Sequence, residues 1–356
     1  MRRSHQHPWL NRFAWTTAAA TLALIAIGGL VTSKGAGMAV PDWPTTYGYN
    51  MFLFPVRLWG MGTGIFYEHS HRLFASFVGM LTTILAIWLW VREPRAWLRW
   101  LGVAAFLAVV LQGVLGGLRV TLLKDEIGIV HAALAQTFLV LVTGIALAAS
   151  GRMQQWAAQL QTVKCSGHLR GIIVAATGLI FVQLILGATM RHQHAGLAVP
   201  DFPLAYGQVW PPMDAAFVER VNQARVGVQE FQPITAFGIG LHMTHRLVAL
   251  LIVSVVGAVA CLAWREWPRA VSVRRLALGW FGLISLQAAL GAATVWSNKA
   301  ADVATAHVVL GALSLLSGAI LTAVSFPARA AQRSQRAVLA SGLARPTFAQ
   351  PRRTTA

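Results

Sequence analysis

The sequence predicts an all-α integral membrane protein in which eight transmembrane helices form two parallel four-helix bundles. Of its 356 residues, 56% are hydrophobic and 11% are charged, whereas a soluble domain carries about 25% charged residues. The apolar residues are gathered into eight long blocks, and four short motifs occur twice in the same order. The composition and the blocks indicate a membrane protein, and the recurring motifs indicate an internal repeat.

Each apolar block is long enough to cross a bilayer as a helix, for which about 20 residues are needed. The blocks lie at residues 13–32, 73–91, 100–118, 128–149, 171–190, 247–264, 276–296 and 304–325. Backbone amides surrounded by lipid must be hydrogen-bonded within the protein, so blocks of this length are helices. The first block is longer than the about 7–15 apolar residues of a signal peptide, and we expect it to be retained.

The net charge of +18 is explained by membrane topology rather than by nucleic-acid binding. With the N-terminus placed in the cytoplasm, 19 of the 29 Lys and Arg residues fall in cytoplasmic segments, although the outer loops are longer. This excess is the positive-inside pattern of membrane proteins. We expect both termini to be cytoplasmic, the basic tail 327–356 to be disordered and to contact anionic lipid, and no nucleic acid to bind.

An internal repeat divides the chain into an N-terminal half, 1–150, and a C-terminal half, 151–326. Residues Ala36-Gly37-Met38-Ala39-Val40-Pro41-Asp42-Trp43-Pro44 recur as Ala195-Gly196-Leu197-Ala198-Val199-Pro200-Asp201-Phe202-Pro203. The later matches pair Glu68-His69-Ser70-His71-Arg72 with His242-Met243-Thr244-His245-Arg246, Leu111-Gln112-Gly113 with Leu286-Gln287-Ala288, and His131-Ala132 with His307-Val308. An even number of helices in each half makes the two copies parallel.

The predicted outer loops, residues 34–71 and 191–244, are long and rich in Gly and Pro. Long loops within a compact protein usually have a function, and proline restricts its own φ and its neighbour. We therefore expect two ordered caps on the outer face. Within them, Asp42 and Asp201 are expected to accept hydrogen bonds from backbone amides of the turns.

Four histidines occupy equivalent places: His71 and His131 in the first half, and His245 and His307 in the second. Each lies at the outer end of a predicted helix that runs from outside to inside, so all four lie at a similar depth. A single histidine at a helix end commonly makes an interfacial hydrogen bond. Ionisable residues in membrane segments are costly, however, and mark functional sites, and four in two matched pairs favour a binding function.

A haem is the ligand that best fits two facing imidazoles. Zinc needs three or four protein ligands, and copper usually adds Cys or Met. Two imidazoles on neighbouring helices of a bundle can take both axial positions of a haem iron. Glycines on other helices would let a flat macrocycle approach the backbone, although glycine also allows tight helix packing; they are Gly113, Gly116, Gly117, Gly187 and Gly291.

Two features accompany the first histidine of each pair. Arg72 and Arg246 follow it directly and could hold haem propionates or extend to lipid headgroups. Glu68 precedes His71 by three residues, on the same helix face, and the second half has His242 in its place. A carboxylate there could move protons or stabilise positive charge on a substrate, or simply stabilise the helix N-terminus. The difference suggests that one half performs chemistry and the other holds a cofactor.

Together these residues resemble the haem A synthase family, the membrane enzymes of cytochrome oxidase biogenesis. The resemblance covers residues 13–325 and rests on the 68–72 and 242–246 motifs, the two Ala-Val-Pro-Asp loops, His131 and His307. It implies an oxidoreductase that converts haem O to haem A, oxidising the C8 methyl group to a formyl by successive hydroxylations. It also implies that His245 and His307 hold a haem b cofactor.

In the first half, the resemblance implies that His71 and His131 receive the haem O substrate and that Glu68 is catalytic. It implies a place in the cell inner membrane, with the histidine sites toward the periplasmic face, and a role in supplying haem A for cytochrome c oxidase. The implied partners are haem O, the haem O synthase, oxidase assembly factors and membrane lipid. The electron donor is not identified by the sequence, and a homo-oligomer is compatible with it. Some bacterial members carry cysteine pairs in the outer loops, and this chain has none there, so no thiol relay applies.

A di-haem b electron-transfer cytochrome is the main alternative. It would explain the four histidines but neither the difference between Glu68 and His242 nor the long outer loops. A transporter built on parallel repeats would place polar groups near the membrane midplane, whereas here they gather at the outer ends. A purely structural assembly protein would not need four imidazoles.

Overall fold

The computed structural model of the chain describes residues 7–62, 64–225 and 232–326. Its helices are α1 (Pro8–Ser33), α2 (Ile65–Arg92), α3 (Ala96–Thr121), α4 (Asp125–Ser150), α5 (Arg152–Gln161), α6 (Gly167–His192), α7 (Ala215–Ala224), α8 (Ala236–Glu266), α9 (Val271–Trp296) and α10 (Ala301–Ser325). Among the described residues, eight helices are long and apolar enough to cross a membrane. The prediction of an all-α protein with eight spans is confirmed to this extent, and the basic tail 327–356 lies outside the described residues.

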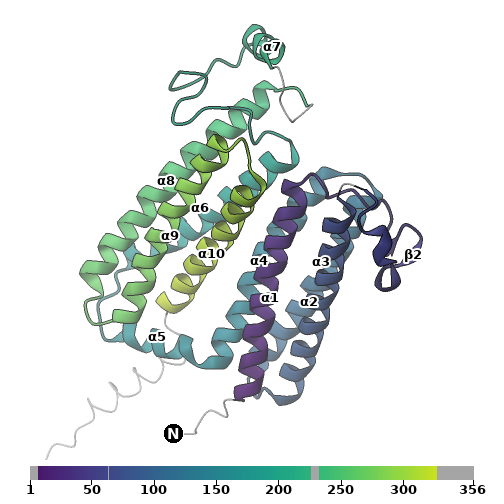
Figure 1. Cartoon of the computed structure of the whole chain (residues 1–356). Coiled ribbons are helices and arrows are strands. Elements are labelled where there is room, and N and C mark those ends of the chain that lie inside the picture. Colours follow the sequence, from purple (N-terminus) through teal and green to yellow (C-terminus); the bar gives the residue numbers. More distant parts are fainter. Residues whose placement is uncertain (1–6, 63, 226–231, 327–356) are drawn as a thin grey trace, which may run out of the picture.

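The long helices form two groups of four that lie side by side (Figure 1). In the N-terminal half, α1 contacts α2 and α4, and α3 contacts the same two helices. In the C-terminal half, α6 and α9 each contact α8 and α10 in the same way. The halves meet where α1 and α4 contact α6 and α10, and we call this surface the seam.

Each half has its own apolar core between its helices. The cores include Leu10, Leu85, Leu98 and Ile145 in the first half, and Ile173, Val256, Trp280 and Leu321 in the second. Small residues let the helices approach, as at Gly318, where a Cβ would lie 2.7 Å from Cζ2 of Trp280. Lipid tails are as apolar as leucine, so close packing of this kind holds helices together in a membrane.

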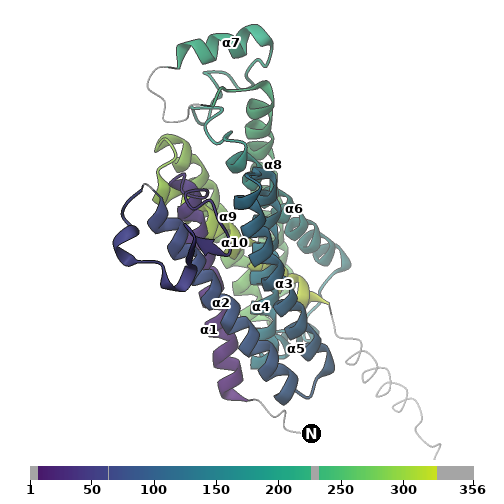
Figure 2. The same ribbon diagram turned by 90° about the vertical axis from the view of Figure 1, so that its right-hand side faces the viewer.

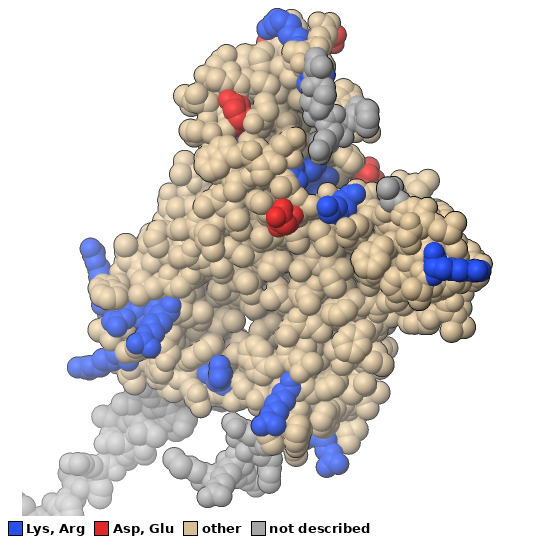
Figure 3. Space-filling model, viewed as in Figure 1, with Lys and Arg blue, Asp and Glu red and all other residues tan. Residues whose placement is uncertain are grey.

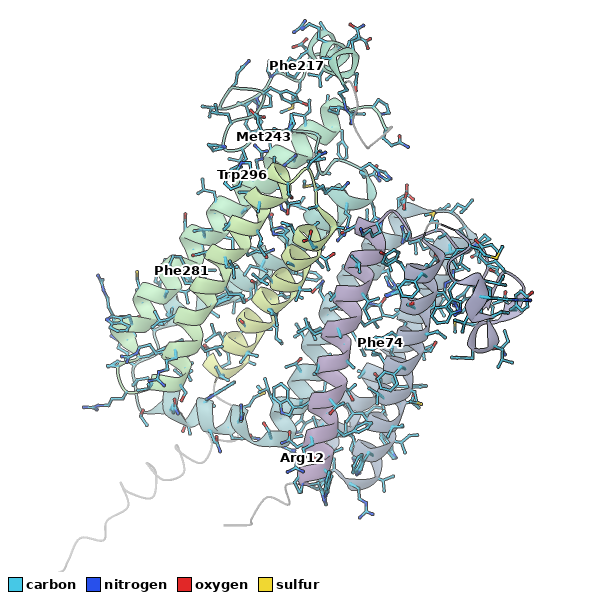
Figure 4. All side chains as sticks on the ribbon, in the orientation of Figure 1. Arg12, Phe74, Phe217, Met243, Phe281 and Trp296 are labelled. Carbon is cyan, nitrogen blue, oxygen red and sulfur yellow. The ribbon has the colours of Figure 1, made fainter. Side chains whose placement is uncertain are left out.

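Charged residues gather toward the two ends of the helices. Much of the middle of the surface in Figure 3 is uncharged, as a surface in contact with lipid requires. Figure 4 places Arg12 near one end of α1, and Met243 and Trp296 toward the opposite end of the C-terminal half. That opposite end carries the loop residues 34–62, 193–225 and 232–235, and we call it the cap end (Figure 2).

Both loops of the cap end contain the same tight turn. Tyr47 and Gly48 have φ values of 49° and 76° and join the short strands β1 (Thr45–Thr46) and β2 (Tyr49–Asn50). The equivalent Tyr206 and Gly207 have φ values of 53° and 73°. Two successive residues with positive φ form a hairpin turn whose twist suits the flanking strands, and glycine adopts this conformation without strain.

The aspartate of each loop motif stabilises this turn. Asp42 accepts hydrogen bonds from the amides of Tyr47 and Gly48 at 2.7 and 2.9 Å, and Asp201 accepts the equivalent two at 2.6 and 2.8 Å. The hydroxyl of Tyr206 also donates to the Ala198 carbonyl at 2.6 Å. The prediction that both aspartates bind backbone amides of ordered turns is confirmed.

Four elements differ from the sequence prediction. α2 and α8 begin at Ile65 and Ala236 rather than near residues 73 and 247, because the polar residues of their first turns bind the caps while the helix continues. α5, in the connection between the halves, contacts α4, α9 and α10. α7 lies at the cap end (Figure 1). Both short helices are too short to be found by a search for membrane spans.

The first cap is expected to loosen at acid pH and in the variant Asp42→Ala. Burial alone would raise the pKa of Asp42, but hydrogen bonds from Gly48, Thr45 and Tyr47 outweigh it and leave the pKa below its usual value of 3.8. A carboxylate with a lowered pKa stabilises the fold above its unfolded pKa, and that stabilisation is lost as the pH falls through the folded pKa.

Hydrogen exchange of residues 40–50, corrected for intrinsic rates, measures this effect. Exchange should accelerate below about pH 3.8 in the native protein, and Asp42→Ala should exchange about tenfold faster at pH 7. Peptides from α9 serve as the internal control. Equal protection of the two proteins at pH 7 would contradict the prediction.

Candidate functional site

The structure places the four predicted histidines at the cap end, on α2, α4, α8 and α10. His71 and His131 are close enough to interact electrostatically, and so are His245 and His307. Each imidazole is surrounded by protein on most sides, yet each residue keeps part of its surface uncovered. One pair therefore lies in each half, and each pair spans two helices.

Each histidine faces a glycine on a neighbouring helix of its own half. A Cβ atom on Gly28, Gly116, Gly187 or Gly291 would lie 3.0, 3.5, 3.4 or 3.2 Å from Cε1 of His71, His131, His245 or His307, respectively. A side chain at these positions would press on the imidazole or stand directly against it. The glycines therefore let the helix backbone form one wall of each imidazole site.

Three of the five glycines that were expected to admit a flat macrocycle contact imidazoles instead. Of the other two, Gly117 faces the indole of Trp43, where a Cβ would lie 2.3 Å from Cδ2, and Gly113 meets no atom within 4 Å. Gly28 was not predicted. The available signal was the repeat itself, because Gly28 and Gly187 are separated by the same 159 residues as the two loop motifs.

Three of the four imidazoles have a buried Nδ1 atom without a hydrogen-bond partner among the described residues, namely those of His71, His131 and His245. Nδ1 of His307 lies 3.1 Å from the carbonyl oxygen of Gln287. A buried polar atom without a partner costs about 1–3 kcal/mol, and a bond from that nitrogen to iron would offset the cost.

These features fit a haem between the imidazoles of each pair. The imidazoles of each pair lie on different helices and are close enough to interact. Each residue keeps uncovered surface, and Nδ1 of His71, His131 and His245 has no partner among the described residues. A zinc site fits less well, because the described part of the chain has no group of three or more His, Cys, Asp or Glu residues that could hold a metal ion.

In each half, an arginine beside the first histidine of the pair holds the cap. Arg72 donates to the carbonyl oxygens of Val40, Asp42 and Thr45 at 2.7, 2.6 and 3.1 Å. It also donates to Oε1 of Glu68 at 2.7 Å, and Oε2 of Glu68 accepts a hydrogen bond from the Val40 amide at 2.9 Å. Glu68 and Arg72 thus hold the first cap against α2.

The second half repeats this arrangement with one change. Arg246 donates to the carbonyl oxygens of Val199, Asp201 and Leu204. His242 takes the place of Glu68, and its Nδ1 lies 3.3 Å from the Val199 amide, which donates to it. The terminal nitrogens of both arginines are therefore bonded to cap carbonyls, a role that the sequence did not indicate, and a contact with haem propionates stays a prediction.

His69 belongs to the cap rather than to the histidine pair. It is 1% exposed, its Nδ1 lies 3.3 Å from the Thr46 hydroxyl, and its ring packs between Phe54 and Trp59 at centroid distances of 4.9 and 4.8 Å. The aromatic contacts attach the cap to the same turn of α2 that carries Glu68.

A polar cluster at the cap end of the seam was not predicted. Arg191, in the last turn of α6, donates to the Gly29 carbonyl of α1 at 2.6 Å and to the Ser33 hydroxyl. Nδ1 of the neighbouring His192 lies 3.6 Å from Oδ1 of Asp125 on α4. The first repeat has Thr and Ser at the positions of Arg191 and His192, and this departure from the repeat was the available signal.

Comparison with known proteins gives the relatives of the chain. Residues 49–320, which include Glu68 and all four histidines, match the family COX15-CtaA, described as cytochrome oxidase assembly protein. The chain is 31% identical over 252 residues to the heme A synthase of Shouchella clausii, covering 69% of this chain and 73% of that protein. It is 27% identical over 338 residues to the heme A synthase of Geobacillus kaustophilus, covering 90% and 95%, respectively.

Valine at Gly291 is expected to lower the haem bound to the purified protein. The Cβ would lie 3.2 Å from Cε1 of His307, and overpacking of this kind costs about 1–3 kcal/mol, or about tenfold in affinity. Gly282→Val on the same helix is the matched control, because no atom lies within 4 Å of that Cβ. The measurement is haem per chain by pyridine haemochrome absorbance, and equal haem contents would contradict the prediction.

Proposed function

This chain belongs to the COX15-CtaA family of cytochrome oxidase assembly proteins, and on that premise we propose that it is a membrane-bound haem A synthase. It is an oxidoreductase that converts haem O to haem A, oxidising the C8 methyl group to a formyl by successive hydroxylations. It thereby supplies haem A for cytochrome c oxidase. The observation that carries this proposal is the pair of interacting imidazoles in each half, each set against a glycine, in a chain whose relatives are named heme A synthase.

In the membrane, we infer that residues 1–150 and 151–326 form two parallel repeats, with both termini in the cytoplasm. The equivalent helix contacts and cap turns of the two halves support this inference, and so does the excess of basic residues at the end opposite the caps. The caps and histidine pairs would then lie toward the periplasmic face of the cell inner membrane.

The two histidine pairs are assigned different ligands. His245 and His307 would hold haem b, which supplies one-electron transfer when bound. His71 and His131 would hold the haem O substrate and orient it within the first half. This assignment follows from Glu68, because the charged group that could act on a substrate lies beside the first pair and is replaced by His242 beside the second.

Glu68 is the catalytic residue of the proposal. The residue is 4% exposed, and its carboxylate accepts hydrogen bonds from Arg72 and from the Val40 amide. Fixed in this way, it could accept a proton at a carboxylate oxygen or stabilise positive charge that develops on the substrate. His242 supports its cap through the same amide contact but brings no carboxylate.

Arg72 and Arg246 are proposed to act mainly by holding the caps over the two pairs. A direct contact with haem propionates would have to compete with three cap carbonyls at each guanidinium. The remaining partners are inferred from the activity: an electron donor, the haem O synthase that makes the substrate, and oxidase assembly factors that receive the product. A homo-oligomer is compatible with the proposal.

The test is to purify the chain from a host that makes haem O, extract its haems and identify them by chromatography and mass. Haem B together with haem O, hydroxylated haem O or haem A is expected. Two haem B per chain, with no modified haem when haem O is plentiful, would instead indicate an electron-transfer cytochrome. The comparisons give no support to that alternative, because the relatives carry the name heme A synthase.

The variant Glu68→Gln is expected to keep haem b and to lose formyl formation. Glutamine can still accept the Val40 amide but lacks the negative charge, so turnover should fall by about 100-fold or more. His242→Gln is the matched control, because it changes the equivalent cap contact in the other half. Haem A per haem b in extracts of both variants is the measurement. Full activity of Glu68→Gln, or an equal loss in both variants, would contradict a catalytic role.

The histidine variants separate the two sites. His245→Ala and His307→Ala should each lose bound haem b, because one axial ligand is removed. His71→Ala and His131→Ala should retain haem b and lose haem A formation. Absorbance spectra of the purified variants, together with their haem extracts, give both readouts. Loss of haem b from the first-half variants alone would reverse the assignment.

A further inference from the structure

Arg119 lies at the cap end of α3 and has hydrogen-bonding capacity that the protein does not use. Its side chain is only 16% exposed. Its one hydrogen bond among the described residues runs from Nη2 to Oδ1 of Asp125 at 3.2 Å, and its Nε is buried without a partner. A guanidinium has five N–H donors, and Arg72 by contrast makes four hydrogen bonds.

Arg119 lies near the first histidine pair. Arg119 follows Gly116 by three residues, so the two lie on the same face of α3, one turn apart. Gly116 is the glycine that faces His131. The charge of Arg119 acts on the imidazoles of both His71 and His131. The guanidinium therefore lies on the cap side of the pair, within electrostatic reach of both members.

The first cap leaves room for the guanidinium. A Cβ on Gly37 would lie 2.8 Å from Nη1 and 3.3 Å from Nη2 of Arg119, so this glycine of the Ala-Gly-Met-Ala-Val-Pro motif lets the loop pass over the cation. The charge is only partly balanced, because the Asp125 side chain is 36% exposed and is also close to His192. A largely buried cation is stabilised by a further anion.

We propose that Arg119 binds a propionate carboxylate of the haem substrate held by His71 and His131, a proposal that rests on the function proposed above. A planar guanidinium pairs with a carboxylate through two parallel hydrogen bonds, and a haem carries two carboxylates on one edge. Arg119 would thus fix which edge of the macrocycle points to the cap, and with it which methyl group lies near Glu68. The second half has Thr294 at the equivalent position, and the glycine equivalent to Gly37, Gly196, lies against Lys299 instead. A planar guanidinium at this place therefore belongs to the first half alone among the described residues.

The experiment compares two probes on the full chain, purified with haem b in its C-terminal half from a host that makes no haem O. The probes are haemin, which has two free propionates, and haemin dimethyl ester, which has none. Binding to the first half is followed by Soret absorbance, and His71→Ala identifies the signal that belongs to this half.

Arg119→Ala should raise the Kd for haemin about tenfold or more and change the Kd for the dimethyl ester less than about twofold. Arg119→Lys keeps the charge but loses the planar pair of N–H donors, so its Kd for haemin should lie between those of the wild-type protein and Arg119→Ala. Arg57→Ala is the matched control, because Arg57 is an exposed arginine of the same cap loop. It should change neither Kd.

Equal weakening of both probes by Arg119→Ala would overturn the proposal and make Arg119 a structural partner of Asp125. An unchanged Kd for haemin, or no binding of haemin to the first half of the wild-type protein, would overturn it as well. The outcome is separable from that of the proposed function. If Arg119→Ala weakens the binding of haemin but not of its dimethyl ester, while the wild-type protein does not convert haem O, the propionate contact is supported and the proposed activity is contradicted. If the protein converts haem O but Arg119→Ala affects both probes equally, the activity is supported and the propionate contact is contradicted.

Discussion

The functional geometry depends on four places where an imidazole lies against the backbone of a neighbouring helix. Each has a glycine: a Cβ at Gly28 or Gly291 would crowd the ring at 3.0 or 3.2 Å, and one at Gly187 or Gly116 would stand in direct contact with it at 3.4 or 3.5 Å. In lipid there is no hydrophobic force between helices, so such close contacts determine how helices pack. The helix spacing at the cap end and the orientation of the imidazoles are therefore fixed by the same contacts.

The caps extend this constraint to the surroundings of the two histidine pairs. Arg72 and Arg246 attach equivalent loops to equivalent helices, and the two cap turns have nearly the same backbone angles. Against this shared frame, the exchange of Glu68 for His242 changes the charge but keeps the contact to the loop amide. At this position the duplicated frame is kept while the charge differs, which separates the chemistry of the side chain from its role in holding the cap.

The sequence predicted the eight spans, the place of the four histidines at one end of the helices and the hydrogen bonds of Asp42. Hydropathy, repeated motifs and turn chemistry are local properties and can be read from the sequence. It did not predict where α2 begins, because polar residues in that first turn lower the hydropathy although they continue the helix. The partners of Arg72 and the glycine behind each imidazole depend on contacts between distant segments. Aligning the repeats residue by residue would have found both Gly28 and Arg191. Gly28 aligns with Gly187, whereas Arg191 aligns with Thr32 and so departs from the repeat.

The seam makes the two halves interdependent. Gly28 faces His71, and the adjacent Gly29 accepts a hydrogen bond from Arg191 of the second half and packs against Thr305, two residues before His307. The same short stretch of α1 therefore lies against His71 of the first pair and contacts the helix that carries His307 of the second. A displacement of either site would be transmitted through packed backbone rather than through a flexible linker. The boundary between the repeats is thus a boundary in the sequence, whereas the proposed substrate site depends on residues from both halves.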